Sequence, residues 1–223
     1  MSMNFQAIYK RRFTPDMEFR QKMWGILCHD LFQKYVPEDS TILEVGAGYC
    51  EFINNIHARK KIALDINADV RTYANPDVET IIGRSEKIDL LSSGSVNNAF
   101  ASNLFEHLSR DSTIATIQEV NRVLTPGGKF IILQPNIRFC AKDYWMFFDH
   151  VTPIDDRALM EVLELNNFQI VSNIPQFLPY TTKSALPKSL FMIKIYLKLR
   201  VAWKIFGQQA LVISSKKDAK NGL

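Results

Sequence analysis

The stretch Thr41-Ile-Leu-Glu-Val-Gly-Ala-Gly48 decides the fold of this chain. Its first five residues are mainly apolar, as expected for a short buried strand, and a helix is expected to follow near 50–58. Glycines between a strand and a helix let the backbone turn tightly and approach a ligand, and the helix N-terminus offers N–H groups without partners. Alone, this turn is weak evidence for a site, because a strand–helix turn without a ligand has the same sequence.

Strands and helices alternate on the C-terminal side of this turn. The alternation predicts a Rossmann-like, doubly wound α/β sheet whose parallel strands are joined by right-handed crossovers. Hydrophobic periodicity places the seven strands at 41–45, 61–65, 77–82, 95–102, 129–133, 168–174 and 209–214. It places further helices at 68–74, 111–124 and 155–166, the second of them stopped by Pro126-Gly127-Gly128.

We expect a single domain, 1–223, because this length suffices for one buried α/β core and is short for two. An N-terminal helical cap, 1–40, has its helix starting at Thr14-Pro15-Asp16, reaching Tyr35 and stopped by Pro37. The remaining parts are a core at 41–174, a helical insertion at 175–207 with a long helix near 188–206, a last strand at 208–215 and a flexible tail at 216–223.

Composition and cysteine spacing say more about the cellular compartment in which the protein is expected than about the reaction it carries out. The net charge of +4 is too small to imply nucleic-acid binding. Cys28, Cys50 and Cys140 have neither metal-ligand spacing nor the even number of a disulfide framework, so we expect free thiols and no metal site. The first residues lack the order of a signal peptide, and no run of about 18 uncharged apolar residues occurs, so the expected location is cytoplasmic.

Asp65 is the second feature of the expected site. It ends the second strand, and an acid at that place in a Rossmann-like sheet accepts hydrogen bonds from ribose hydroxyls. A lone Asp at a strand end would otherwise cap a helix, so its pairing with the glycine turn carries the inference. Nicotinamide sites prefer G-x-G-x-x-G/A, and Glu51 stands at the third position here, which disfavours an oxidoreductase.

Five motifs then resemble class I S-adenosylmethionine (SAM)-dependent methyltransferases of the small-molecule, methyltransferase type 11-like branch. Residues 42–48 look like motif I, 63–67 like the acidic motif, 83–86 like the adenine contact, and 99–108 like the fourth-strand motif. Glu119-Val-Asn-Arg-Val-Leu-Thr-Pro-Gly-Gly-Lys-Phe130 is close to the helix–PGG–strand signature. The resemblance spans 41–174 in the correct order, makes this region the SAM-binding core, and implies an antiparallel last strand.

The resemblance assigns cofactor contacts residue by residue. Arg84 departs from it, since many relatives have Asp before the adenine contact, so the contacts there are the less certain ones. The implied cofactor is S-adenosyl-L-methionine, with S-adenosyl-L-homocysteine as product. Its expected contacts are Glu44 at the ammonium, Gly46, Ala47, Gly48 and Tyr49 around the methionine, Asp65 at the ribose, Ile66, Ser85 and Glu86 at the adenine, and Asn103 and Leu104 beneath the sulfonium.

Two histidines are the candidate catalytic residues. Methyl transfer from a sulfonium is an in-line displacement in which the protein aligns the acceptor and removes a proton where the acceptor requires it. His107 follows the fourth strand, and His150 lies in an aromatic stretch after the fifth, where acceptor pockets form. We rank His150 above His107, with Asp149 orienting it. Both histidines are equally compatible with a packing role, and many methyltransferases need no base.

The expected acceptor is a small molecule, a sugar or a lipid-linked glycan precursor. After the fourth strand the chain reads Asn103-Leu-Phe-Glu and lacks the Asn/Asp-Pro-Pro-aromatic clamp of the resembling enzymes that methylate planar exocyclic amines. No Pro-Cys nucleophile is present either, so DNA is not the expected target. The alternative is a non-catalytic SAM-binding regulatory or scaffold protein, which would keep the glycine turn but bind no acceptor.

The segment 186–206 mixes large apolar residues with Lys188, Lys194, Lys198, Arg200 and Lys204. One interpretation is a helix in peripheral contact with the inner face of the membrane, where it reaches a lipid-linked acceptor. The other, which we favour, is a helix packed against the domain or against the partner in a homodimer. With the N-terminal cap, this segment is expected to cover the acceptor.

Overall fold

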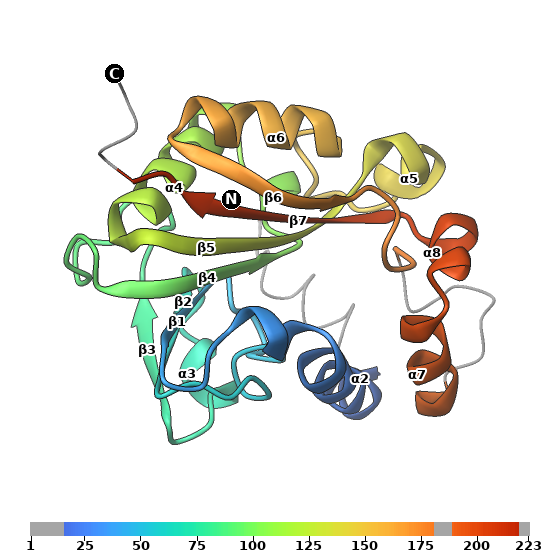
Figure 1. The fold of residues 1–223 in the computed structure, drawn as a ribbon, viewed down its shortest axis with the longest axis horizontal. Helices are drawn as coiled ribbons and strands as arrows, with labels where there is room; N and C mark the ends of the chain where they lie inside the picture. The colour runs from blue at the N-terminus through green and yellow to red at the C-terminus, as the bar shows by residue number, and fades with distance from the viewer. Residues whose placement is uncertain (1–15, 181–188, 219–223) are drawn as a thin grey trace.

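The computed structural model describes residues 16–180 and 189–218, which form a seven-stranded sheet with helices on both faces (Figure 1). The strand order is β3-β2-β1-β4-β5-β7-β6, and β7 runs antiparallel to both neighbours while the β3-to-β5 pairs are parallel. This confirms the predicted fold class. The strands are β1 (Thr41–Val45), β2 (Lys60–Asp65), β3 (Val78–Ile82), β4 (Val96–Ser102), β5 (Leu124–Pro135), β6 (Phe168–Ile174) and β7 (Gln209–Lys216).

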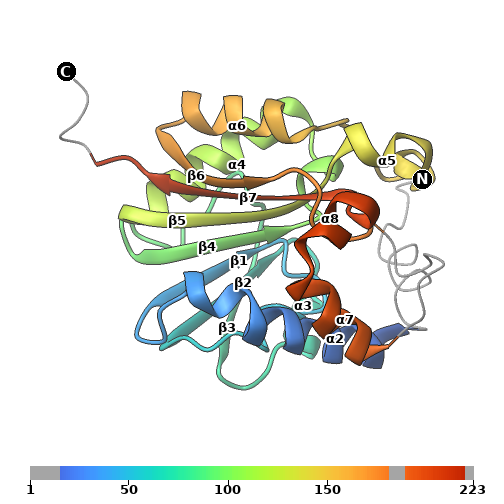
Figure 2. The same ribbon diagram turned by 45° about the vertical axis from the view of Figure 1, so that its right-hand side comes forward.

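Helices cover both faces of the sheet. Figure 1 places α4 and α6 on one face and α2 and α3 on the other, and in Figure 2 α7 lies against α2. The elements are α2 (Met17–Asp30), η2 (Phe32–Tyr35), α3 (Val70–Tyr73), η3 (Phe105–His107), α4 (Arg110–Val123), α5 (Ile137–Tyr144), α6 (Asp156–Leu165), α7 (Leu190–Lys198) and α8 (Arg200–Phe206).

The central strands are buried on both faces, and alternate residues enter two separate cores. In β4, Ala99 and Ala101 pack under α4 and α6, while Phe100 points into the core under α2. Strand residues alternate between faces, so a doubly covered sheet requires apolar residues at consecutive positions. This is the physical reason that Ile42, Leu43 and Val45 of β1 are all apolar and that its two polar residues, Thr41 and Glu44, are buried as well.

An aromatic cluster joins the cap to the sheet. The Phe100 ring stacks on Phe52, with centroids 3.7 Å apart and planes 10° apart. Trp24 and Phe32, from α2 and η2, meet Phe100 edge-on at 5.9 and 5.3 Å. The described part of the cap, residues 16–40, is therefore packed into the core under α2.

Three local expectations were wrong, and one helix was not expected. Residues 48–55 form consecutive turns in place of a helix, and Cys50 has φ +57°, which interrupts helical geometry there. The helix near 188–206 is two helices broken at Leu199, and α5 follows β5 without having been predicted. Helix α4 ends at Val123, because Thr125 precedes a proline, so Pro126-Gly127-Gly128 lies within β5.

The boundaries at the chain ends also differ. Helix α2 ends at Asp30, and a 3₁₀ turn, η2, carries the chain to Tyr35. Strand β7 continues to Lys216, one residue into the expected tail. The expected cap at Thr14-Pro15 and tail residues 219–223 lie outside the described residues.

The aromatic cluster predicts a large loss of stability for Phe100→Ala. The substitution leaves a cavity at a side chain that is fully buried, and truncations of this kind cost about 3–5 kcal/mol. Urea unfolding followed by circular dichroism measures the change. Phe148→Ala is the control, because that side chain is 72% exposed and should change stability by at most about 0.5 kcal/mol. Equal losses for the two variants would contradict the described packing.

Candidate functional site

The carboxyl ends of β1, β2 and β4 meet where the strand order reverses, and the glycine turn lies there. Gly46 has φ +73°, and its N–H donates to the Leu64 carbonyl at 2.8 Å. A Cβ atom on Gly46 would come within 2.9 Å of Leu104 Cδ1. The turn therefore needs glycine at this position for its backbone conformation and for its close approach to the chain after β4.

Glu44 is a buried acid on β1, just before the turn. Its Oε2 accepts a hydrogen bond from the Ile53 N–H at 3.0 Å, and the side chain borders the large cavity described below. Burial raises the pKa of this carboxyl well above its ordinary value, and the Ile53 hydrogen bond opposes that rise. A cationic ligand group beside Glu44 would favour the charged carboxylate.

Asp65 ends β2 and fixes the glycine turn from the side. Its Oδ2 accepts from the Gly48 N–H at 2.8 Å, and its Oδ1 accepts from the Asn67 N–H at 2.7 Å. Burial raises the pKa of Asp65, while these backbone hydrogen bonds act in the opposite direction. The next residue, Ile66, is 67% exposed, so an apolar side chain stands open to solvent beside this acid.

The expected adenine contacts are engaged with neighbouring side chains. Ser85 Oγ lies 2.8 Å from Thr116 Oγ1, and Glu86 Oε1 accepts from Arg84 Nη2 at 2.6 Å. Arg84, the residue that departs from the family pattern, thus neutralises Glu86. Both residues follow β3, at the same edge of the sheet as Asp65.

A cavity of about 450 Å³ opens beside the glycine turn and extends beneath α2, α7 and α8. The lining is mostly apolar on the helical side. It brings together Glu44, Gly46, Ala47, Tyr49, Asn103, His107 and His150 from the expected site. The other expected cofactor contacts do not line this cavity: Gly48, Asp65, Ile66, Ser85, Glu86 and Leu104. One end of the expected cofactor site, at β1 and β4, therefore lies inside the cavity. The other end, around β2 and β3, lies outside it.

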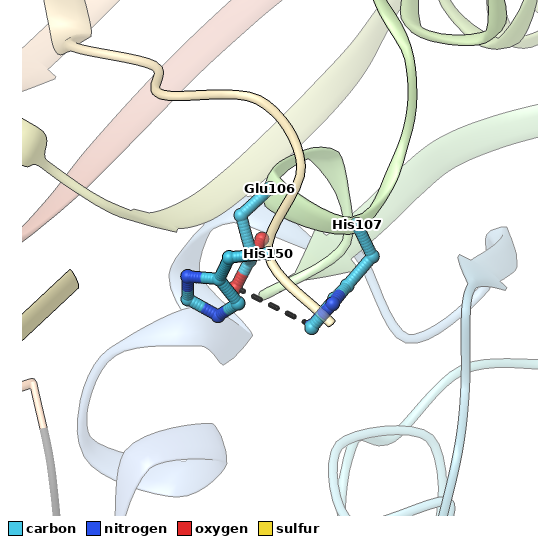
Figure 3. A group of neighbouring side chains, drawn as sticks. All are labelled: Glu106, His107 and His150. Carbon is cyan, nitrogen blue, oxygen red and sulfur yellow. Dashed lines mark ion pairs between the residues drawn. The ribbon is translucent and has the colours of Figure 1, made fainter. Parts of the chain in front are cut away.

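The two candidate catalytic histidines lie together. Their ring centroids are 5.0 Å apart, and Glu106 lies beside both (Figure 3). His107 Nδ1 is 3.0 Å from the Asp149 carbonyl oxygen and 3.5 Å from Asp149 Oδ2, so Asp149 orients His107. The sequence expectation assigned Asp149 to His150. His150 Nε2 instead lies 3.3 Å from the Tyr180 hydroxyl.

Comparison with known proteins agrees with this geometry. The family model described as a methyltransferase domain matches residues 43–132. A search among curated proteins finds no match. The match and the strand order together support a class I SAM-dependent methyltransferase.

Solved structures with the same fold cover nearly the whole chain. A Haloferax volcanii methyltransferase, solved in complex with the Trm112 methyltransferase activator, is 16% identical with a TM-score of 0.70 over 98% of each chain. A SAM-dependent methyltransferase from Archaeoglobus fulgidus is 16% identical, TM-score 0.68, over 92% of this chain and 99% of that one. A SAM-dependent methyltransferase from Thermotoga maritima is 16% identical, TM-score 0.64, over 94% and 98%. At this identity the likeness shows the fold alone.

The methyltransferase retains a turn shaped for its cofactor. A Cβ on Gly46 would meet Leu104, so the turn packs closely there, and the buried Glu44 carboxyl borders the cavity beside it, which suits the ammonium group of SAM. Asp65 stands at the carboxyl end of β2 with its carboxylate tied to the turn. These residues fit SAM as the cofactor.

Sequence reasoning missed three side chains of the enzyme's cavity. Glu106 lies inside the quoted fourth-strand motif but was passed over, although a charged residue next to a histidine is a usable signal. Tyr180 had no local signal, since its place depends on the chain returning after β6. Arg20, on α2, donates two hydrogen bonds to the Glu51 carboxylate, at 2.7 and 2.5 Å. Glu51, whose position disfavoured a nicotinamide site, therefore connects the cap to the glycine turn.

Gly46→Ala should weaken SAM binding by at least about tenfold. The new methyl meets Leu104 and occupies the approach to the cofactor, and φ +73° adds strain of about 1–2 kcal/mol to the folded state. Calorimetric titration with SAM measures the affinity. Gly94→Ala is the matched control, because Gly94 has φ +66° with nothing within 4 Å of an added Cβ. Unchanged affinity in Gly46→Ala would show that the cofactor does not lie against this turn.

Proposed function

We propose that this methyltransferase transfers the methyl group of SAM to a small molecule, a sugar or a lipid-linked acceptor held in the 450 Å³ cavity. The observation that carries the proposal is the continuity of this cavity. It begins at Glu44, Gly46 and Asn103 on the cofactor side and extends to Met192 and Tyr196 of α7. An acceptor inside it would meet the cofactor while being shielded from water.

In this proposal the cofactor reaches from the end of the site inside the cavity, at β1 and β4, to the end outside it, around β2 and β3. Glu44 receives the ammonium group, and the backbone of 46–49 holds the methionine portion. Asn103 and Leu104 lie beneath the sulfonium; Asn103, with φ +50°, is held by its N–H bond to the Leu133 carbonyl at 2.9 Å. Asp65 takes the ribose, and Ile66, Ser85 and Glu86 flank the adenine outside the cavity.

The polar wall of the cavity is proposed to act on the acceptor. The helical side is apolar, while Glu106, His107 and His150 gather on the wall next to Asn103. An acceptor with an apolar body would place its oxygen or nitrogen against these groups, since they can hydrogen-bond to it. His150 and His107 are then placed to take up the proton that an acceptor hydroxyl or ammonium loses.

Part of the helical insertion packs on the domain, as the sequence analysis favoured. Trp203 is buried against Phe177, and Tyr196 donates to the Phe177 carbonyl. The outer face remains open: Phe191, Val201 and Ile205 are each at least 67% exposed. Exposed cations accompany them at Lys194, Lys198, Arg200 and Lys204, and Lys188 lies outside the described residues.

We infer that this outer face of α7 and α8 contacts an anionic membrane surface from one side. Apolar side chains interleaved with cations bind the interface of anionic lipid. Among the described residues, no helix is both long and apolar enough to cross a bilayer. Because α7 also lines the acceptor cavity, this contact would bring a lipid-linked acceptor to its entrance.

A thermal melt tests the cofactor. SAM or S-adenosyl-L-homocysteine at about 100 times Kd adds roughly 2.7 kcal/mol, a rise in Tm of about 5–10 °C for a chain of this length. NADH should leave Tm unchanged. Asp65→Asn should reduce the shift, and Asp89→Asn, on the surface, should not. No shift with SAM in folded wild-type protein would leave the fold without the proposed cofactor site.

Co-sedimentation with vesicles tests the membrane contact. We expect binding to vesicles rich in phosphatidylglycerol and not to phosphatidylcholine alone, weakened at least tenfold by Lys194→Glu, Lys198→Glu and Lys204→Glu together. The control changes the same charge elsewhere, at Lys22, Lys60 and Lys87, which are all at least half exposed. Equal binding of the two triple variants would overturn the proposal. A concentration-dependent dimer without vesicle binding would instead assign this face to a second copy of the chain.

A further inference from the structure

Glu106, His107 and His150 form a compact group of metal-ligand side chains on the polar wall of the cavity (Figure 3). Each offers one ligand atom, and these atoms all lie within 4.8 Å of one another. Glu106 and His150 are buried, at 1% and 7% exposure, and His107 is partly buried. The group joins η3 to the loop after α5, two parts of the chain that are far apart in sequence.

The Glu106 carboxylate is held in one orientation. Its Oε2 accepts from Gln134 Nε2 at 2.8 Å, and its Oε1 lies 3.9 Å from His107 Nε2. A buried carboxylate is costly unless a positive group or several donors stabilise it. Glu106 is buried, and no lysine or arginine of residues 16–180 and 189–218 forms an ion pair with it. A bound cation at Oε1 would supply the missing positive charge.

His107 has the arrangement of a metal-bound histidine. Its Nδ1 lies 3.0 Å from the Asp149 carbonyl oxygen, which can only accept a hydrogen bond. In the neutral ring the proton therefore sits on Nδ1, and Nε2 presents its lone pair on the side of Glu106. Metal-binding histidines commonly donate their second ring N–H to a carbonyl or carboxylate in this way.

His150 is fixed by aromatic packing next to His107. Tyr144 and Phe147 lie 4.8 and 5.2 Å from its ring centroid, and Tyr144 is itself anchored by its hydroxyl on the Thr152 carbonyl. The Thr152 and Val151 N–H groups in turn bond to the Glu106 carbonyl. The backbone of Glu106 and the loop that carries His150 are therefore directly connected.

We propose that Glu106, His107 and His150 bind one divalent transition-metal cation of the Zn²⁺, Co²⁺, Mn²⁺ or Fe²⁺ class. Two imidazoles and one carboxylate suit these ions and leave coordination positions for other ligands. Bonds of about 2.0–2.2 Å require ligand atoms about 3.0–3.5 Å apart, so side-chain shifts of about 1 Å complete the site. The sequence expectation of no metal rested on cysteine spacing, which does not test this constellation.

The open positions fall on the cavity side, because all three residues line the cavity. If the proposed function holds, the acceptor oxygen or nitrogen would bind there, and the cation would lower the pKa of an acceptor hydroxyl. The proton would then pass to water instead of to a histidine, because both rings are bound to the cation. Metal binding itself does not depend on the proposed function and can be measured without an acceptor or SAM.

Titration of the untagged, chelator-stripped full chain with Co²⁺ tests the site. We expect one tight site per chain with visible absorption bands of nitrogen- and oxygen-bound Co²⁺, displaced by Zn²⁺. His107→Ala, His150→Ala and Glu106→Gln should each weaken Co²⁺ binding at least about 100-fold. Each variant's SAM-induced Tm shift reports whether it is folded, since none of the three residues is placed against the cofactor.

The chain offers a matched control, because its four histidines include two that are exposed and remote, His29 and His57. The double variant His29→Ala, His57→Ala should bind Co²⁺ like the wild type. Binding lost in this control and retained in His107→Ala or His150→Ala would overturn the proposal, as would no tight Co²⁺ site in wild type. A SAM-induced shift with no Co²⁺ site would overturn the metal alone and leave the proposed methyl transfer standing.

Discussion

The hydrogen bond from the Gly48 N–H to the Asp65 carboxylate links the carboxyl ends of β1 and β2, and the cofactor side of the enzyme depends on it. With the Gly46 N–H bonded to the Leu64 carbonyl, it fixes the conformation of the turn at Gly46. Parallel pairing of β1 with both β2 and β4 puts these ends on the same edge of the sheet. Glycine, acid and strand pairing therefore act as one unit.

Two buried acids lie at this end of the sheet, one proposed to face the cofactor and the other the acceptor. Glu44 lies on β1 at the cofactor end, and Glu106 lies after β4 at the acceptor end. Burial disfavours the charged form of both carboxyls, and a positive partner would favour it. On this account the partner of Glu44 is the cofactor's ammonium group, and the partner of Glu106 is a metal cation. If the proposed function holds, methyl transfer takes place in the cavity between them.

Much of the fold was predictable because hydrophobic periodicity is local. Six of the seven strands were placed to within two residues, whereas β5 begins five residues before the expected start at 129. The glycine turn, Asp65 and the following motifs pointed to the family. The prediction of a helix near 50–58 was wrong because Cys50 adopts φ +57°, which the residue pattern does not indicate. Helix α5 was not predicted because its residues combine aromatic and charged side chains without a clear helical period.

The site was predictable only as far as its motifs extended. Residues at the ends of β1, β2 and β4 were found because their chemistry follows directly on a strand. The Glu106, His107 and His150 group was found only in part, since it depends on how the loop after α5 returns to η3. Asp149 was expected beside His150 but contacts His107, because adjacency in sequence does not give the direction of a side chain.

A crystal structure of the full chain with S-adenosyl-L-homocysteine would test the central claim most directly. The account predicts the ribose hydroxyls on Asp65, the ammonium at Glu44, and the sulfur at the boundary between Asn103 and the cavity. The methyl position would then face the wall that carries Glu106 and the two histidines. A ligand whose sulfur points away from this cavity, or whose ribose does not contact Asp65, would contradict the account.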